Sequence, residues 1–158
     1  MSRMKKILLS VAVLALTTLG AGFAYKATLQ LDATAPVYTS GGLAIQGYDP
    51  VAYFTQSAAM KGESRFSHDW NGVTWRFASA EHRAAFQADP ERYAPQFGGY
   101  CAYAVANGYT AKTDPRAWHI EDGKLYLNFN NDVRTQWHGQ RHDLIRKGHR
   151  NWPGVIQD

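Results

Sequence analysis

The stretch Gly72-Val-Thr-Trp-Arg-Phe-Ala-Ser79 and the stretch Gly123-Lys-Leu-Tyr-Leu-Asn-Phe-Asn130, which begins 51 residues later, follow one pattern. Each starts at the glycine of a polar turn and continues with apolar side chains at every second position, as expected for a half-buried strand. Each ends at a residue whose side-chain oxygen can accept a hydrogen bond from the first turn of a helix. The two stretches therefore predict a unit of hairpin, cap and helix that occurs twice.

The helix after each cap has a predicted end. The first helix spans about residues 80–87 and stops before Asp89-Pro90, because proline disfavours a helical residue before it. The second spans about residues 131–147, is weakened inside by Gly139 and ends near Gly148. Residues 93–109 contain either a short helix around residues 100–105 or a buried loop, and the sequence leaves this open. These patterns predict an α+β fold, a small single domain built from two hairpin-cap-helix units around an aromatic core.

The chain begins with the layout of an export signal. A basic start, Met1-Ser-Arg-Met-Lys-Lys6, is followed by residues 7–19 without any charge and then by the small-residue run 20–24. This order is typical of a secretory signal peptide, with cleavage after Ala24. The apolar run is also long enough for an uncleaved anchor. We therefore expect a periplasmic or secreted protein. The alternative is a membrane-anchored protein that faces the periplasm, with residues 7–24 as an inner-membrane tether.

Charge and length narrow the classes of protein further. The 158 residues carry a net charge of +4, but Arg3, Lys5 and Lys6 belong to the leader, so 14 basic residues remain against 13 acidic ones. Nucleic-acid binding needs a dense basic patch, so no nucleic acid partner is expected, and the sequence names no protein partner. The expected organisation is a signal peptide or anchor (1–24), a linker (25–42), one domain (43–105), a second hairpin-helix unit packed on it (106–153) and a tail (154–158).

Cys101 is the only cysteine in the chain. An exported protein with one cysteine cannot form an internal disulfide, so this thiol is a buried packing group, a metal ligand, a reactive nucleophile or a link between chains. The flanking Gly98-Gly99 pair lets a backbone or a ligand approach closely. Free cysteines are nevertheless among the most buried residue types, and the neighbouring aromatic residues also fit a core position.

Four blocks in the first half of the chain, taken in order, resemble a YHS domain, over residues 43–105. They are Gly47-Tyr-Asp-Pro-Val-Ala-Tyr-Phe54, Asn71-Gly-Val-Thr-Trp-Arg-Phe-Ala-Ser-Ala-Glu-His-Arg-Ala-Ala-Phe86, Asp89-Pro-Glu-Arg-Tyr93 and Gly98-Gly-Tyr-Cys101. The chain is similar in particular to exported, stand-alone proteins that carry this domain. The resemblance implies a small hairpin-and-helix fold and a role in binding metal. Copper is the usual proposal, because the domain accompanies copper-transporting ATPases.

Three positions depart from the form of the domain found with those ATPases, which has cysteines there. This chain has Ala52, Ala78 and His82 instead. Histidine can ligate copper or zinc, but it makes a harder site than a thiolate does. A tetrahedral thiolate site is therefore not carried over to this chain.

The residues expected to bind a metal are Cys101 and His82, followed by Asp49 and Tyr48. Tyr100 and Tyr103 flank the cysteine closely and are the expected residues of an apolar ligand pocket, with a place in the core as the alternative.

The favoured function is an exported metal-binding or metal-handling module of YHS type, without catalysis and with copper as the candidate metal. The alternative is a metal-free small-ligand or protein-interaction module in which Cys101 is an inert core residue. A thiol enzyme ranks third, because the sequence contains no Gly-x-Ser-x-Gly, His-Glu-x-x-His, P-loop or Cys-x-x-Cys motif. It also supplies no third group to orient a Cys101–His82 pair.

Overall fold

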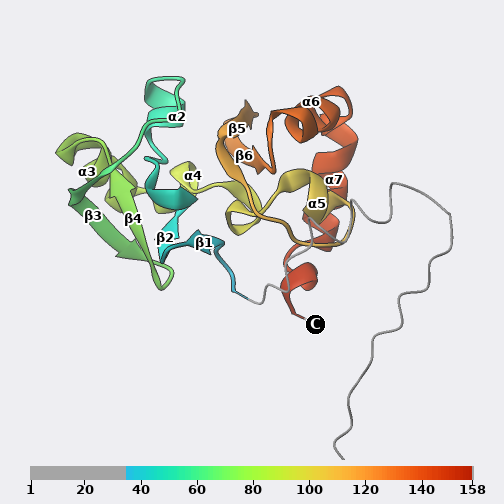
Figure 1. Ribbon diagram of the computed structural model, residues 1–158, viewed down its shortest axis with the longest axis horizontal. Coiled ribbons are helices and arrows are strands. Elements are labelled where there is room, and N and C mark those ends of the chain that lie inside the picture. The colour runs from blue at the N-terminus through green and yellow to red at the C-terminus, as the bar shows by residue number, and fades with distance from the viewer. Residues whose placement is uncertain (1–34, 158) are drawn as a thin grey trace, which may run out of the picture.

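The computed structural model describes residues 35–157, which form two lobes joined by a short connection (Figure 1). The first lobe contains a four-stranded sheet in the order β1-β2-β4-β3, with β2 parallel to β4 and the other neighbours antiparallel. Its elements are β1 (Thr39–Ser40), β2 (Leu43–Ala44), η1 (Ile45–Gly47), α2 (Ala52–Thr55), β3 (Glu63–Trp70), β4 (Val73–Phe77), α3 (Ala80–Ala88) and α4 (Pro90–Tyr93).

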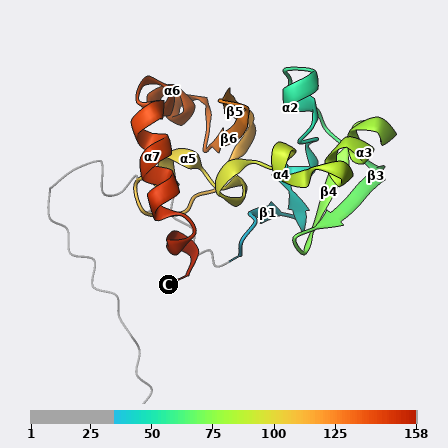
Figure 2. The ribbon, with the colours of Figure 1, turned by 180° about the vertical axis from the view of Figure 1, so that it is seen from behind.

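The second lobe is built on an antiparallel hairpin of two strands that helices cover, as the view from behind also shows (Figure 2). Its elements are η2 (Gln96–Gly99), α5 (Ala102–Ala106), β5 (Asp114–Glu121), β6 (Lys124–Asn128), α6 (Asn131–Gly139), α7 (Arg141–Asn151) and η3 (Gly154–Ile156). The connection between the lobes runs from α4 into η2.

The two hairpins have the same register. Every residue pair of the β3–β4 ladder corresponds to a pair of the β5–β6 ladder 51 positions later, and both ladders shift register between the first and second pair. The matching pairs are Glu63–Phe77 with Asp114–Asn128, Ser67–Arg76 with Trp118–Leu127, His68–Trp75 with His119–Tyr126, Asp69–Thr74 with Ile120–Leu125, and Trp70–Val73 with Glu121–Lys124. The predicted caps correspond as well, since Ser79 accepts from the N–H of His82 and Asn130 from that of Val133.

The equivalence extends upstream of the hairpins with a spacing of 52. Ile45 to Gly47 and Phe97 to Gly99 are each a run of three residues with positive φ, and each run is closed by a tyrosine N–H that donates to the first carbonyl. Further on, the N–H of Asp49 donates to Met60 O, and the N–H of Cys101 donates to Ala111 O. The loop in between is thus one residue shorter in the second copy. We call residues 45–88 the first unit and residues 97–139 the second unit.

The helices agree with the predicted caps but not with every predicted end. Helix α3 starts after Ser79, as predicted, and the open question about residues 93–109 is answered by helix α5. The single helix predicted over residues 131–147 is wrong, because the chain leaves helical geometry at Gln140 and forms α6 and α7 instead. Gly139 lacks a Cβ, so the helix is least stable at this point.

Aromatic side chains fill both units in matching positions. Trp75 stacks at 5.0 Å on Phe86 in the first unit, and Tyr126 stacks at 5.4 Å on Trp137 in the second, and all four are buried. Leu125 and Leu127 of β6 belong to the core cluster of the first unit, so the hairpins share one core. The predicted α+β single domain with two hairpin-cap-helix units around an aromatic core is confirmed.

Order begins before the predicted start at Leu43. Val37 is buried, and Thr39–Ser40 pairs with Leu43–Ala44. The proposed signal peptide or tether, residues 1–24, and the first part of the proposed linker lie outside the described residues. Within residues 35–157, no helix has both the length and the apolar character needed to cross a bilayer.

Candidate functional site

Asp49 is fully buried at the start of the first unit, and its carboxylate accepts hydrogen bonds on both oxygens. Oδ1 accepts from the backbone N–H groups of Val51 at 2.8 Å and Ala52 at 3.3 Å. Oδ2 accepts from the N–H of Ala78, at the end of β4, at 2.8 Å, and from Nδ1 of His82 at 2.6 Å. The carboxylate therefore ties α2, β4 and α3 together, with no oxygen left without a donor.

His82 lies in the first turn of α3, where the Ser79 cap fixes its backbone. Its ring lies between two partners, because Nδ1 contacts Asp49 and Nε2 lies 3.2 Å from Oγ1 of Thr55 at the end of α2. The side chain is 15% exposed, whereas Thr55 is exposed. Asp49, His82 and Thr55 thus form a line from the interior to the surface. We call these three residues the Asp49 triad.

Cys101 occupies the position in the second unit that Asp49 occupies in the first. Burial raises the pKa of its thiol to about 11, although hydrogen bonds from the backbone N–H groups of Ala104, Phe129 and Tyr103 act in the opposite direction. Ala104, Phe129 and Tyr103 occupy the positions of Ala52, Ala78 and Val51, the three residues whose N–H groups donate to Asp49 in the first unit. The thiol is 1% exposed and donates weakly to Oδ1 of Asn128 at 3.8 Å.

Val133 takes the place of His82 in the second unit, and it packs in one apolar cluster with Cys101, Ala104, Tyr109 and Ala111. The sulfur therefore faces apolar neighbours where Asp49 faces an imidazole. Cys101 and His82, predicted as a pair of ligands, belong to different units.

The predicted tyrosines have separate surroundings. Tyr48 is half-buried, with the ammonium of Lys61 lying 5.6 Å from its ring centroid. Tyr100 is buried beside Tyr38 and Trp152, and its hydroxyl donates to Ala35 O. Tyr103 is half-buried between two core clusters. Of the six predicted site residues, only Asp49 and His82 are joined by a side-chain hydrogen bond. Tyr48 and Tyr100 occupy equivalent positions in the two units.

A copper ion does not fit these residues as they are placed. All the acceptor positions named above on Asp49 are engaged, and Cys101 is a protonated thiol in an apolar cluster. Over residues 35–157, no group of three or more His, Cys, Asp and Glu side chains is arranged to hold a metal ion.

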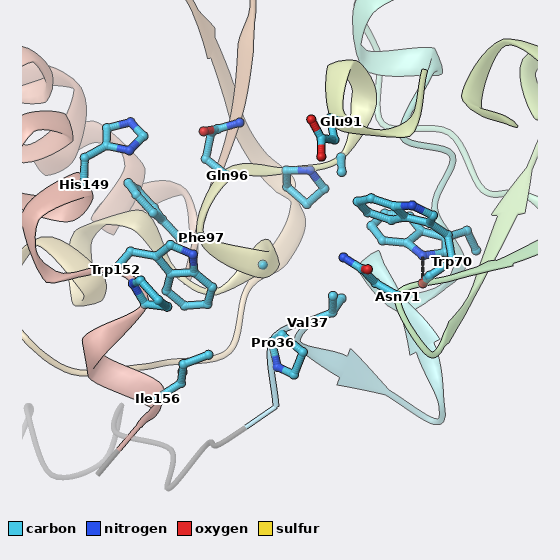
Figure 3. A pocket seen from close by; sticks show the side chains of 15 residues that line it. Pro36, Val37, Trp70, Asn71, Glu91, Gln96, Phe97, His149, Trp152 and Ile156 are labelled. Carbon is cyan, nitrogen blue, oxygen red and sulfur yellow. Dashed lines mark hydrogen bonds between the residues drawn. The ribbon is translucent and has the colours of Figure 1, made fainter. Parts of the chain in front are cut away.

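A cavity of about 470 Å³ opens where the two lobes meet (Figure 3). Trp70 and Asn71 reach it from the β3–β4 turn, Phe97 and Trp152 form the opposite wall, and Pro36 lies at its edge. The remaining lining residues are Val37, Trp75, Glu91, Ala94, Pro95, Gln96, Gly98, His149, Pro153 and Ile156. We call this cavity the aromatic cleft.

Four polar side chains line the aromatic cleft beside its rings, namely Asn71, Glu91, Gln96 and His149. Glu91 and Gln96 stand on one side of the cleft, and His149 lies beside Phe97, with 5.0 Å between the two ring centroids. Partial burial, followed by the charge of Lys124, lowers the pKa of His149, which favours a neutral imidazole at physiological pH. Aromatic walls combined with a small set of polar side chains are the usual make-up of a small-molecule site.

The cleft depends on close contact at Gly98. A Cβ at this position would overlap the carbonyl oxygen of Pro36. The glycine therefore lets residues 36–38 run against the second lobe, where the N–H of Tyr38 donates to Gly98 O at 2.9 Å.

A separate polar cluster surrounds Glu121 on the second lobe. His119 Nε2 and Arg141 Nε lie 2.8 and 2.7 Å from Oε2, and these hydrogen bonds are the main causes that lower the pKa of Glu121 to about 2. His138 of α6 packs edge-to-face against His119, and His142 of α7 lies 3.7 Å from Glu121. The equivalent of Glu121 in the first unit is Trp70, which lines the aromatic cleft.

Sequence reasoning missed Thr55 and most of the aromatic cleft. Thr55 lies in no motif, and it joins the triad only because its hydroxyl at the end of α2 lies within reach of His82 on α3. Trp70, Trp152 and Pro36 are far apart in the chain, and the only signal for the two tryptophans was the high aromatic content.

No family model matches the chain, and searches of curated proteins and of solved structures gave no match either. The resemblance to YHS domains therefore stays a prediction.

Proposed function

We propose that this protein is a metal-independent module that binds a small molecule with a flat apolar ring system in the aromatic cleft. The observation that carries the proposal is the cleft itself, an aromatic-walled cavity of about 470 Å³ at the junction of the two lobes. Ligand cavities in proteins have volumes of roughly 300–1,000 Å³ and favour such junctions.

The chemistry of the walls supports a ring-shaped ligand. Phe97 and Trp152 on one side and Trp70 on the other offer ring faces and edges, against which an aromatic ligand stacks with a gain of about 0.5–1.5 kcal/mol per ring pair beyond burial alone. Gln96 and the carboxylate of Glu91 supply an acceptor for a hydroxyl or amine on the ligand. We therefore expect a ligand with one polar donor on an apolar ring system.

The metal-handling module implied by the YHS resemblance has weaker support. Its main ligand, Cys101, is 1% exposed and protonated, and its two expected partners are engaged with each other. Membership of the YHS family and export to the periplasm remain part of the proposal, supported by the sequence blocks and by the layout of residues 1–24.

The test is a ligand screen on the purified protein. Small aromatic alcohols, phenols and amines are screened by thermal shift, and their affinity is measured by calorimetry on the wild type and on Trp152→Leu. The cleft variant should bind at least tenfold more weakly. Trp118→Leu, which removes a tryptophan outside the cleft lining, is the matched control and should leave the affinity unchanged.

A second arm of the experiment tests the metal alternative. The metal-free protein is titrated with Cu(I) and Cu(II), alongside Cys101→Ser. Tight, stoichiometric copper binding that this substitution abolishes would contradict a metal-independent module. A ligand whose affinity is equal in the wild type and in Trp152→Leu would remove the aromatic cleft as its site.

A further inference from the structure

The Asp49 triad has the connectivity of a hydroxyl activated by a histidine and a carboxylate. Asp49 Oδ2 lies 2.6 Å from His82 Nδ1, and His82 Nε2 lies 3.2 Å from Thr55 Oγ1. Asp49 accepts hydrogen bonds on both oxygens, so it orients the ring with the imidazole proton on Nδ1. In the neutral ring, Nε2 then carries the free lone pair and can accept the proton of the Thr55 hydroxyl.

The Thr55 hydroxyl is held between two acceptors. Oγ1 is 3.1 Å from the carbonyl oxygen of Val51 and 3.2 Å from His82 Nε2, and its single proton can serve only one of them at a time. Thr55 is an exposed residue, so the hydroxyl stands at the surface end of the triad. A nucleophile, a base and a group that orients the base are therefore in contact, in a line that ends at the surface.

The second unit shows that the fold does not need this chemistry. It builds the same loop, helix, hairpin and cap with Cys101 and Val133 in place of Asp49 and His82, and Val133 has no side-chain nitrogen or oxygen to donate. A purely structural explanation of the imidazole in the first unit is thereby weakened, since the equivalent corner is stable with an apolar side chain.

We propose that Thr55 is an acyl-accepting nucleophile, with His82 as its general base and Asp49 as the positioning residue. The substrate class is activated esters of small carboxylic acids. No oxyanion-stabilising donor is assigned beside Thr55, and a good leaving group lowers the need for one. The site is separate from the aromatic cleft, because the cleft is lined from the β3–β4 turn and the triad lies at the other end of β4.

The reaction balances without a cofactor. Thr55 Oγ1 forms a bond to the carbonyl carbon while its proton passes to His82 Nε2. The tetrahedral intermediate breaks the bond to the leaving oxygen, which either takes the proton from His82 or leaves as a stable anion, in which case His82 releases the proton to solvent before the next step. Water then attacks the acyl-threonine with His82 as base, releases the carboxylic acid and restores the hydroxyl.

The experiment measures hydrolysis of p-nitrophenyl acetate by the purified protein, followed by mass spectrometry of the trapped acetyl adduct. Thr55→Val and His82→Gln should each lower the rate above background by about 100-fold, the scale of general acid–base catalysis. Thr55→Ser should retain the activity. Ser57→Ala, which removes an exposed hydroxyl two residues away, is the matched control and should behave like the wild type.

Each outcome decides the proposal. Loss in Thr55→Val together with an adduct on Thr55 supports it. Turnover that survives in Thr55→Val but not in His82→Gln would overturn it, because His82 would then act alone, and so would the absence of turnover above a buffer blank. If His82→Gln does not fold, Thr55→Val and Thr55→Ser still decide.

The role of Asp49 has its own readout. The proton that His82 Nδ1 donates to a carboxylate gives a deshielded signal in the proton NMR spectrum. Asp49→Asn should remove this signal, whereas Thr55→Val should keep it while losing turnover. A signal that persists in Asp49→Asn would show that Asp49 does not position the ring.

Discussion

The two units have the same backbone arrangement but opposite chemistry at one corner. In the first unit a buried carboxylate receives three backbone N–H groups and an imidazole. In the second a buried thiol receives the equivalent N–H groups, and Val133 packs beside it in place of the imidazole. The comparison teaches that this corner requires an acceptor for backbone donors. It does not require a carboxylate or a histidine, and these are the features that give the first unit its own chemistry.

The largest expected effect is a difference in stability between variants that remove the two buried acceptors, Asp49 and Cys101. Asp49→Ala leaves three backbone N–H groups and His82 without their partner, which should cost about 3 kcal/mol or more of the free energy of unfolding. Cys101→Ala removes a weaker acceptor and should cost about 1 kcal/mol. Urea unfolding of both variants measures the difference. Equal losses would mean that the two corners are energetically alike.

A smaller effect on stability is expected when the residues at the corner of the first unit are replaced by their equivalents from the second unit. Asp49→Cys alone leaves the His82 ring without its acceptor, whereas Asp49→Cys combined with His82→Val reproduces the pair found at Cys101 and Val133. The double variant should therefore recover about 1 kcal/mol relative to Asp49→Cys, a coupling typical of residues in contact. A double variant that is less stable than the additive sum would break the equivalence of the two corners.

Low pH should destabilise the second unit through Glu121, a carboxylate that has no counterpart in the first unit. Hydrogen bonds from His119 and Arg141 lower the pKa of Glu121 from 4.5 to about 2. A carboxyl group whose pKa is lowered by folding contributes stability above its unfolded pKa and loses it as the pH falls through the folded pKa. The wild type should therefore lose stability between about pH 4.5 and pH 2, and Glu121→Gln should lose less over the same range.

Denaturant titrations at several pH values measure this difference. Trp70 occupies the equivalent position in the first unit and carries no charge. An identical pH dependence in the wild type and in Glu121→Gln would show that the cluster around Glu121 does not distinguish the units.

The smallest effect is expected for the thiol of Cys101, which should not react with a thiol reagent in the folded protein. Cys101 is 1% exposed and its pKa is about 11, so a disulfide reagent at about pH 8 should modify it only on unfolding. The rate of modification, followed with and without denaturant, checks this. Rapid reaction of the native protein would reopen the thiol chemistry considered for this residue, and Cys101→Ser is the blank.

The hairpins and caps were predictable because their signals are local. Alternation in Val73, Trp75 and Phe77 and the capping oxygens of Ser79 and Asn130 act within a few residues, so the sequence shows them directly. The equivalence of Asp49 and Cys101 was hidden, because the shorter loop changes the spacing from 51 to 52. The sequence predicted that Gly139 weakens the helix but not that the helix ends there. Whether a glycine interrupts a helix depends on the packing around it.

The candidate sites were predictable only in part. Asp49 and His82 were both named as site residues, and they are in contact. They were expected to share a metal with Cys101, because the resemblance placed all three in one domain, whereas the second unit in fact starts before Cys101. The aromatic cleft could not be predicted, because its walls come from distant parts of the chain: residues 35–38, which we call the arm, the first hairpin, and the end of α7 with the residues after it.

The arm that crosses Gly98 has a mechanical consequence. Two hydrogen bonds, from Tyr38 N–H to Gly98 O and from the Tyr100 hydroxyl to Ala35 O, fasten it to the second lobe, while β1 fastens it to the first sheet. Tension applied to the chain before Ala35 would load these bonds before it reached either hairpin. Because Pro36 and Val37 also line the aromatic cleft, a pull that broke these bonds would displace part of the cleft's own wall.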